Sequence, residues 1–272
     1  MIQAIYTSLS GMLNHRTRMD VLSNNIANIN TTGFKAAQAN FQDSLYRTMR
    51  AGTARTNPAQ LGLGVILAGV ITNFAQGPMQ STGRQLDLAI SGNGFFGVKR
   101  DGGNAKEELF FTREGSFSVD KEGYLINADG LKLVNDSEQP IHLNVSASKL
   151  IDAISIASNG KVNVTYSDGS TDESNIIGLF NFTNPNGLLK VGGNLFAYNK
   201  DVKPNPAGEM QSEKKPGQNG LGVILSGCLE MANVDLANEL GNLIVTQRGY
   251  EANAKVFTTS DEVLRETIDL KR

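Results

Sequence analysis

Few residues in this chain are of the types that carry out catalysis. Its two histidines, His15 and His142, lie far apart, and its single cysteine, Cys228, stands between two small or apolar neighbours. No local spacing assembles a Ser-His-Asp or Cys-His arrangement, and two histidines with one cysteine fall short of the usual zinc ligand set. We therefore expect no enzyme, no metal site and no cofactor, and we expect the cysteine to be a small buried hydrophobic residue.

Two further strings resemble ligand-binding motifs without the context that those motifs need. The string from Gly92 to Gly97 has the spacing of a dinucleotide fingerprint, but a strand pattern follows it where the fingerprint needs a helix. The string from Asp168 to Glu173 lacks the alternating ligands and the distal glutamate of a calcium loop. We expect both to be turns of β-hairpins, the second with a solvated tip.

The overall composition excludes two classes of partner. The chain has 272 residues, a formal net charge of -2 and 19% charged residues, so it lacks the excess of basic residues that phosphate binding needs. No run of about 18 apolar residues is present, and the first residues lack the basic and then apolar pattern of a secretory signal. We expect neither nucleic acid nor a small-molecule substrate as a partner, no membrane span and no cleaved signal peptide.

The C-terminal stretch, residues 233–268, carries the clearest pattern. Its seam positions follow one another in alternating steps of four and three residues, which is the 3.5-residue period of a coiled coil. Two explanations are open: an amphipathic helix packed on its own domain, or a coiled-coil arm whose partner lies elsewhere. The seam comprises Leu236, Leu240, Leu243, Gln247, Tyr250, Ala254, Phe257, Asp261, Leu264 and Ile268, with Gln247 and Asp261 as polar positions that fix the register.

The N-terminal stretch has the same period, and it provides a partner within the chain. Its seam positions are Ile5, Leu9, Met12, Met19 and Ile26. We expect the two terminal helices to pair as a stem, with the first helix fraying through an asparagine-rich end and stopping at Gly33.

The residues between the two helices are mostly β. The pattern predicts a short amphipathic helix and a linker over residues 36–60. Short apolar runs then alternate with Asn-Gly and Asp-Gly turns over residues 61–232, which is typical of antiparallel hairpins. Residues 200–217, with their prolines, are expected to form a return loop. The predicted fold is therefore α+β, with residues 1–35 and 233–272 forming a coiled-coil-like stem and residues 61–232 forming an antiparallel β domain.

Several motifs resemble a known family, the bacterial flagellar axial proteins that form the rod and hook. Near the N-terminus, residues 23–28 read Ser-Asn-Asn-Ile-Ala-Asn and residues 30–35 read Asn-Thr-Thr-Gly-Phe-Lys. Residues 86–96 resemble the internal motif of the family, and residues 112–117 and 120–125 follow it in the order expected for the family. The C-terminal signature resembles residues 245–253 and 258–264. The similarity is specific at both ends and through about residue 135, and is only general over residues 136–215.

The resemblance implies a structural subunit that polymerises as a helical tube, a hollow shaft that transmits motor torque and conducts exported subunits. It implies export through the flagellar apparatus without a cleaved signal, and contacts with other copies and with neighbouring rod, hook and ring proteins. Residues 43–50, the length and the extra residues 47–62 resemble the distal rod members, whereas residues 69–77 and 269–272 also resemble short hook members. We favour the distal rod, with the hook or another rod protein as alternatives. A more remote alternative is a β-rich adhesin with a coiled-coil stem.

Small and apolar residues outside the seam indicate further contacts of the last helix. A helix that is apolar on several sides is normally buried, so these positions would otherwise be wet. We assign the following residues to packing between subunits: Asn24, Asn25, Asn28, Gly33, Gly241, Val245, Gly249 and Ala252.

Overall fold

The computed structural model describes residues 2–53, 55–100, 108–144, 151–198, 215–218 and 220–270. These residues form two compact units. Unit 1 comprises Met1–Ile29, Ala36–Asn73 and Val234–Arg272, and unit 2 comprises Asn30–Lys35 and Phe74–Asn233. The predicted return loop, residues 200–217, lies almost entirely outside the described residues.

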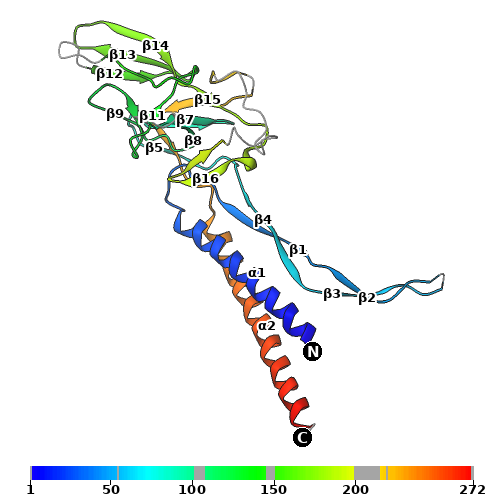
Figure 1. Ribbon diagram of the computed structural model, residues 1–272. Helices are drawn as coiled ribbons and strands as arrows, with labels where there is room; N and C mark the ends of the chain where they lie inside the picture. Colours follow the sequence, from blue (N-terminus) through cyan, green and yellow to red (C-terminus); the bar gives the residue numbers. More distant parts are fainter. Residues whose placement is uncertain are drawn as a thin grey trace. The chain divides into compact units, whose positions relative to one another are not determined.

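Unit 1 is built around two long helices, α1 (Ile2–Ala27) and α2 (Leu236–Asp269). The first turn of α2 is capped by Asp235, whose carboxylate accepts hydrogen bonds from the backbone N–H groups of Ala237 and Asn238. The two helices lie side by side, with the chain ends marked N and C at the same end of the pair (Figure 1). Both predicted terminal helices are therefore confirmed as helices.

The end of α1 differs in detail from the prediction. The helix stops at Ala27, and the Asn28 side chain donates to the backbone oxygen of Asn24 at 2.9 Å, so side-chain amides do satisfy this terminus. Gly33, which was expected to end the helix, lies six residues further on and has a φ of +68° in unit 2. Its Cβ would lie 2.6 Å from the backbone nitrogen of Glu114, so both backbone angle and space require glycine there.

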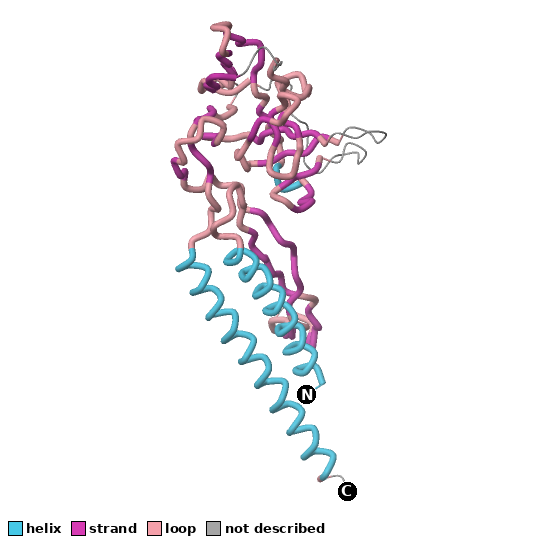
Figure 2. Tube along the Cα trace, turned by 90° about the vertical axis from the view of Figure 1, so that its left-hand side faces the viewer, coloured by secondary structure: helices cyan, strands magenta, loops and turns pink. Residues whose placement is uncertain are grey.

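The predicted short helix and linker over residues 36–60 are wrong. This stretch forms β1 (Ala37–Asp43) and β2 (Tyr46–Arg50), which continue into β3 (Ala59–Gly62) and β4 (Val65–Thr72). Strand β1 pairs with β4 and β2 pairs with β3, both antiparallel, so the segment is a long two-stranded ribbon beside α1 (Figure 2). The apolar residues of the segment fit a helical period, but pairing with the β-branched run of β4 decides its structure.

Unit 2 contains the remaining strands, and every pairing between its named strands is antiparallel. Its largest sheet has the order β16-β17-β8-β7-β11-β10-β9, with β15 also paired to β7, and a three-stranded meander joins β12, β13 and β14. Strand β18 pairs with β6, and β19 pairs with β5. The bounds are β5 Met79–Ser81, β6 Leu88–Ser91, β7 Phe95–Lys99, β8 Leu109–Thr112, β9 Ser118–Val119, β10 Leu125–Ile126, β11 Lys132–Leu133, β12 Ile151–Ile156, β13 Lys161–Tyr166, β14 Thr171–Ile176, β15 Leu179–Phe180, β16 Leu189–Gly192, β17 Leu195–Ala197, β18 Val223–Ser226 and β19 Cys228–Glu230, with a 3₁₀ turn at Pro185–Gly187.

The core of unit 2 lies between these sheets. Apolar side chains from β6, β7, β10, β11, β12, β13 and β18 form one buried cluster, and a second cluster is aromatic, with Phe95, Phe111 and Phe180 among its members. The α+β class with an antiparallel β-rich centre is thus confirmed. The turn from Asp168 to Glu173 joins β13 to β14 as a hairpin tip, as expected. The turn at Gly92 joins strands β6 and β7 of different sheets, so the hairpin expected there is wrong.

Candidate assembly surface

The contact between α1 and α2 is close because glycines line it. A Cβ atom on Gly11 of α1 would lie 2.8 Å from the side-chain oxygen of Asn253, and one on Gly249 of α2 would lie 2.6 Å from the His15 ring. Four residues forward along α1, from Gly11 to His15, correspond to four residues back along α2, from Asn253 to Gly249. The two helices are therefore antiparallel, and a side chain at either glycine would require the facing Asn253 or His15 side chain to move.

A buried asparagine ties the helix pair to the ribbon. Asn25 of α1 is 1% exposed; its amide donates to the Ala37 carbonyl at 2.8 Å and lies 3.3 Å from a Glu239 carboxylate oxygen. Its carbonyl accepts from the Ala37 N–H at 3.0 Å, so Asn25 binds both backbone groups of the first residue of β1. From His15 to Asn25 and from Gly249 to Glu239 the separation is the same, so the antiparallel register continues without a slip.

The helices meet one residue earlier than the predicted seam. The buried positions of α1 are Ser8, Gly11, Leu22 and Asn25, and the buried position of α2 is Thr246. Predicted seam residues that are half-buried are Ile5, Met12, Met19, Ile26, Leu243, Ala254, Phe257, Asp261 and Leu264. Those that are exposed are Leu9, Leu236, Leu240, Gln247, Tyr250 and Ile268.

This shift corrects the role of Gln247. Its side chain is exposed, whereas the neighbouring Thr246 is fully buried and donates to the Asn242 carbonyl at 2.7 Å. The periodicity of the sequence marks the apolar rows of the helices, but the closest approach follows the small residues, because only they let two backbones come near.

The residues assigned to packing between subunits divide into two groups. Asn25, Gly33 and Gly249 are used inside the chain, which corrects their assignment, and Asn28 is half-buried with its amide on Asn24. Asn24, Gly241, Val245 and Ala252 are exposed, and a Cβ on Gly241 would meet no atom within 4 Å.

Large apolar side chains are exposed along both helices. Val245 is 65% exposed and Ile244 is 57% exposed, and neither makes up part of the helix–helix contact. An apolar surface of this extent marks an interaction site in soluble proteins. Its members on the helices are Ile2, Tyr6, Leu9, Leu13, Leu236, Leu240, Ile244, Val245, Tyr250, Val256, Val263, Ile268 and Leu270.

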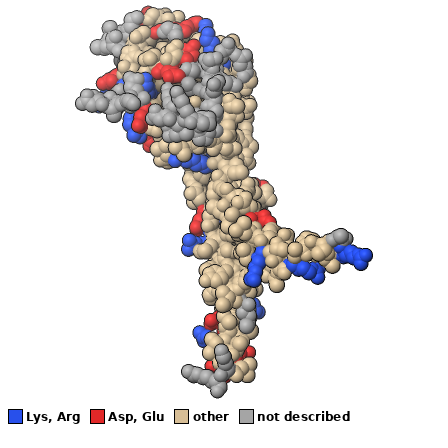
Figure 3. Space-filling view, turned by 45° about the vertical axis from the view of Figure 1, so that its right-hand side comes forward, with Lys and Arg blue, Asp and Glu red and all other residues tan. Residues whose placement is uncertain are grey.

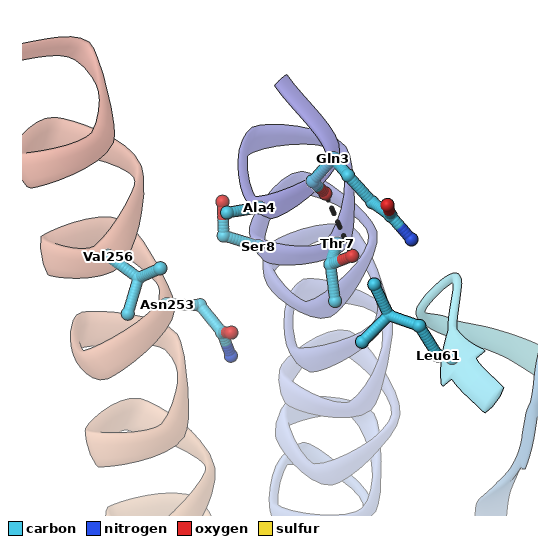
Figure 4. Close-up of a pocket in the computed structure, with 8 residues that line it drawn as sticks. Gln3, Ala4, Thr7, Ser8, Leu61, Asn253 and Val256 are labelled. Carbon is cyan, nitrogen blue, oxygen red and sulfur yellow. Dashed lines mark hydrogen bonds between the residues drawn. The ribbon is translucent and has the colours of Figure 1, made fainter. Parts of the chain in front are cut away.

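A shallow cavity opens where α1, α2 and β3 meet. Its volume is about 410 Å³, and Gln3, Thr7, Leu61 and Val256 are among the residues that line it (Figure 4). The Gln3 amide nitrogen is buried and has no hydrogen-bond partner within the described residues. The residues that line the cavity carry no formal charge, so they offer no counter-charge to a charged ligand.

His15 is the titratable group of the helix contact. Burial, and to a smaller degree the positive charge of Arg18, lower the pKa of His15 below its ordinary value of 6.5. Its Nδ1 atom is buried and has no hydrogen-bond partner in the described part of the chain. The neutral imidazole therefore suits this position better than the charged one.

In unit 2, a buried charged cluster joins three separate stretches of chain. The Lys35 Nζ atom lies 2.6 Å from one Glu230 carboxylate oxygen and 2.8 Å from the Ala75 carbonyl, and the Lys35 side chain is fully buried. The other Glu230 oxygen lies 3.1 Å from Arg113, whose guanidinium also stands 5.3 Å from the centre of the Phe95 ring. Burial lowers the pKa of Lys35 and of Arg113, and the Glu230 charge opposes that shift in both. The cluster is structural, because the three charged side chains bind one another and nearby carbonyls inside unit 2; the Arg113 Nε atom is buried without a hydrogen-bond partner among the described residues.

Comparison with known sequence families gives three matches in chain order. Residues 5–35 match the flagella basal body rod protein family, and residues 89–164 match the flagellar hook protein FlgE/F/G D1 domain. Residues 225–270 match the flagellar basal body rod FlgEFG protein C-terminal family. The first match contains most of α1, and the third contains all of α2.

Similar proteins extend over the whole chain. The flagellar basal-body rod protein FlgG of Bacillus subtilis is 39% identical over 278 residues, and the alignment covers all of both chains. The chain belongs to the flagellar basal-body rod protein family. The FlgG protein of Borreliella burgdorferi, 35% identical with full coverage of both chains, supports the same assignment within the flagellar axial proteins. This rod protein is a structural subunit of the flagellar basal body.

The hook alternative has weaker support. The flagellar hook protein FlgE of Borreliella burgdorferi is 28% identical over an alignment of 453 residues, far longer than this chain. The alignments with the two FlgG relatives extend over 278 and 280 residues, close to the 272 residues of the rod protein. The similarity therefore places the rod protein closest to the distal rod members, as predicted.

Among the described residues of the rod protein, no helix is long and apolar enough to cross a membrane. The same residues contain no group of three or more His, Cys, Asp or Glu side chains placed to hold a metal ion. Cys228, predicted to be buried, is a half-buried free thiol.

Sequence reasoning missed several residues of the helix contact. Ser8, Gly11, Asn25 and Thr246 are not apolar, so a search for apolar periodicity does not select them. A search for small residues at the same period would select Ser8, Gly11 and Gly249, because close helix packing uses small side chains. The buried Lys35 and Glu230 carry no local signal, since their pairing joins residues 195 positions apart.

Proposed function

We propose that this chain forms a helical homopolymer, the distal rod of the flagellar basal body, through its paired terminal helices. The observation that carries the proposal is the exposed apolar surface of α1 and α2 beside a helix contact that is small and polar. In a single chain this surface faces water, which is unfavourable by roughly 25 cal/mol for each Å². Contact with neighbouring copies would bury it.

The antiparallel pair is the stem of one subunit in this proposal, in the manner of a short coiled coil. Gly241, Val245, Ala252 and Asn24, all exposed, would contact adjacent stems. The surfaces that meet would be different parts of the chain, and such a contact gives an open helical filament when its rotation does not close a ring. The inner layer of the tube would consist of stems, and unit 2 would lie outside it.

The proposed partners are further copies of this chain, neighbouring rod, hook and ring proteins, and the flagellar export apparatus. The proposed location is extracytoplasmic, after export without a cleaved signal. The adhesin alternative has no support from the comparisons, which identify only flagellar proteins among the relatives described above.

Electron microscopy and sedimentation velocity of the full chain at rising concentration test the proposal. We expect tubes that grow without a fixed stoichiometry above a critical concentration. Val245→Asp places a charge on the exposed apolar surface and should prevent growth while the circular dichroism of the monomer stays unchanged. Gln247→Glu, a charge on the same helix at an exposed polar position, is the matched control. A closed oligomer of fixed size would contradict the proposal.

A further inference from the structure

The ribbon of unit 1 ends in a cationic hairpin whose arginines have no acidic partner among the described residues. Strands β2 and β3 are exposed along their whole length, and residues 46–62 contain Arg47, Arg50 and Arg55 without any acidic residue. None of the three arginines forms an ion pair within the described residues. Arg50 donates to the Asn57 carbonyl at 3.2 Å, which steadies the hairpin and leaves the positive charge of the guanidinium unneutralised.

An irregular register puts two of these charges on one face. Thr48 pairs with Gln60 and Arg50 pairs with Ala59, so Met49 is an extra residue on β2. On a regular strand, two residues three positions apart face opposite sides. Because the bulge adds one residue between them, Arg47 and Arg50 instead face the same side of the ribbon. Two strand positions of about 3.3 Å each separate them.

The last turns of α2 carry the opposite charge on one face. Glu262, Glu266 and Asp269 follow one another at steps of four and three residues, which places them along one side of a helix. All three are exposed, and none forms an ion pair within the described residues, whereas Asp261 is paired with Arg265 at 3.2 Å. At about 1.5 Å per residue this acidic face extends over roughly 10 Å.

Both charged surfaces have exposed apolar neighbours. On the hairpin, Tyr46 is 55% exposed and Met49 is 67% exposed. At the end of α2, Ile268 is 64% exposed and the C-cap residue Leu270 is 88% exposed. Charge beside exposed apolar side chains is the composition of a protein interface, where the apolar part supplies affinity and the charges supply orientation.

We infer that the cationic hairpin of one copy docks on the acidic face of α2 in another copy. This inference rests on the proposed polymer and names one of its contacts. The hairpin projects away from the last turns of its own α2 (Figure 1), and the space-filling view shows Lys and Arg surface along this arm (Figure 3). The hairpin therefore presents its charge outward, to a second copy. Since the hairpin and the acidic face are different surfaces, the contact is head-to-tail, which is the kind of contact that an open helical filament needs.

Charge reversal in the full chain tests this contact. We expect Arg47→Glu, Arg50→Glu and Arg55→Glu together to raise the critical concentration for assembly about tenfold or more, because attraction becomes repulsion. Glu262→Lys, Glu266→Lys and Asp269→Lys together should do the same. A chain that carries all six changes restores the complementarity and should assemble at close to the wild-type concentration. The two triple variants should also assemble when mixed, although neither assembles alone at the wild-type concentration.

Controls separate this contact from general effects of charge. Lys121→Glu with Lys161→Glu reverses two exposed cations of unit 2 and should leave the critical concentration within about twofold of wild type. The contact would be overturned if the triple variants assemble like wild type, or if the chain with all six substitutions fails to assemble near the wild-type concentration. Either result would leave the polymer proposal standing. Wild-type protein that forms no filament at any concentration would contradict the proposed function and this contact with it.

Discussion

Gly249 of α2 lies directly against the imidazole ring of His15 in α1. A Cβ at that glycine would approach the ring to 2.6 Å, inside any normal carbon contact. The His15 ring therefore occupies the space that a side chain at residue 249 would need. The same position was predicted to face a neighbouring subunit, and the structure instead uses it within the chain.

Gly249→Ala is expected to destabilise the helix pair although alanine is the better helix former. The gain in helix propensity is about 1 kcal/mol. Overpacking costs about 1–3 kcal/mol, so the net change should be unfavourable. The measurement is thermal unfolding of the full-length monomer followed by circular dichroism at the helix band. A higher melting temperature would show that the helices have room to separate without cost.

Gly241→Ala provides the contrasting case on the same helix. The position is exposed and open, so the monomer should gain about 1 kcal/mol of helix stability. If Gly241 packs against an adjacent stem, the same change should raise the critical concentration for assembly. Stability and assembly would then move in opposite directions, and parallel changes would argue against a role between subunits.

The stability of the helix pair should depend on pH through His15. Its pKa in the folded chain lies below the ordinary value of 6.5, so the unfolded chain binds the proton more readily. The free energy of unfolding should therefore fall as the pH is lowered through 6.5, and level off once the pH is below the folded pKa. Urea unfolding of the monomer between pH 8 and pH 5 measures this slope.

His15→Gln is the control for the pH effect. Glu114 of unit 2 has a pKa that burial raises above 4.5, and its contribution has the opposite sign, with stability regained as the pH falls. The difference between wild type and His15→Gln isolates the histidine, because Glu114 is present in both. An equal slope in the two proteins would assign the acid sensitivity to another group.

Removing the carboxylate of the buried cluster should strongly destabilise unit 2. Glu230→Gln leaves Lys35 and Arg113 buried without their counter-charge, and breaking a buried pair in this way costs about 3–5 kcal/mol. Urea unfolding monitored by tyrosine fluorescence measures the loss. Glu122→Gln, at an exposed position of unit 2, should change stability by less than about 0.5 kcal/mol. A similar loss of unfolding free energy in both variants would show that the buried charged cluster does not stabilise unit 2.

The elements that could be predicted are those whose signals are local. Alternating steps of four and three residues predict both terminal helices, and Asp-Gly turns such as the one after Tyr166 predict hairpins that the structure confirms. Residues 37–50 could not be assigned in this way. Their structure depends on pairing with β4 and β3, and Phe41 and Leu45 match a helical period as well as a strand.

The face on which the two helices meet could not be predicted from apolar periodicity either. Apolar periodicity measures which positions avoid water, whereas the approach of two helices depends on side-chain size. In most proteins the two coincide. Here Thr246 and Gly11 make the contact while Leu240 and Ile244 stay exposed, so the pattern predicts the pairing of the helices but not the face used.

The hydrogen bond from the Gly33 N–H to the Glu230 carbonyl, 2.7 Å long, bears on the order of folding. Asn25 and Glu239 are 214 residues apart, so an unfolded chain would lose considerable entropy in bringing them together. Once unit 2 has folded, Gly33 and Glu230 are adjacent. Asn25 lies eight positions before Gly33, and Glu239 lies nine positions after Glu230. Bringing Asn25 and Glu239 together then costs little conformational entropy. We expect the two helices to pair last and rapidly, starting from the ends that are joined to unit 2.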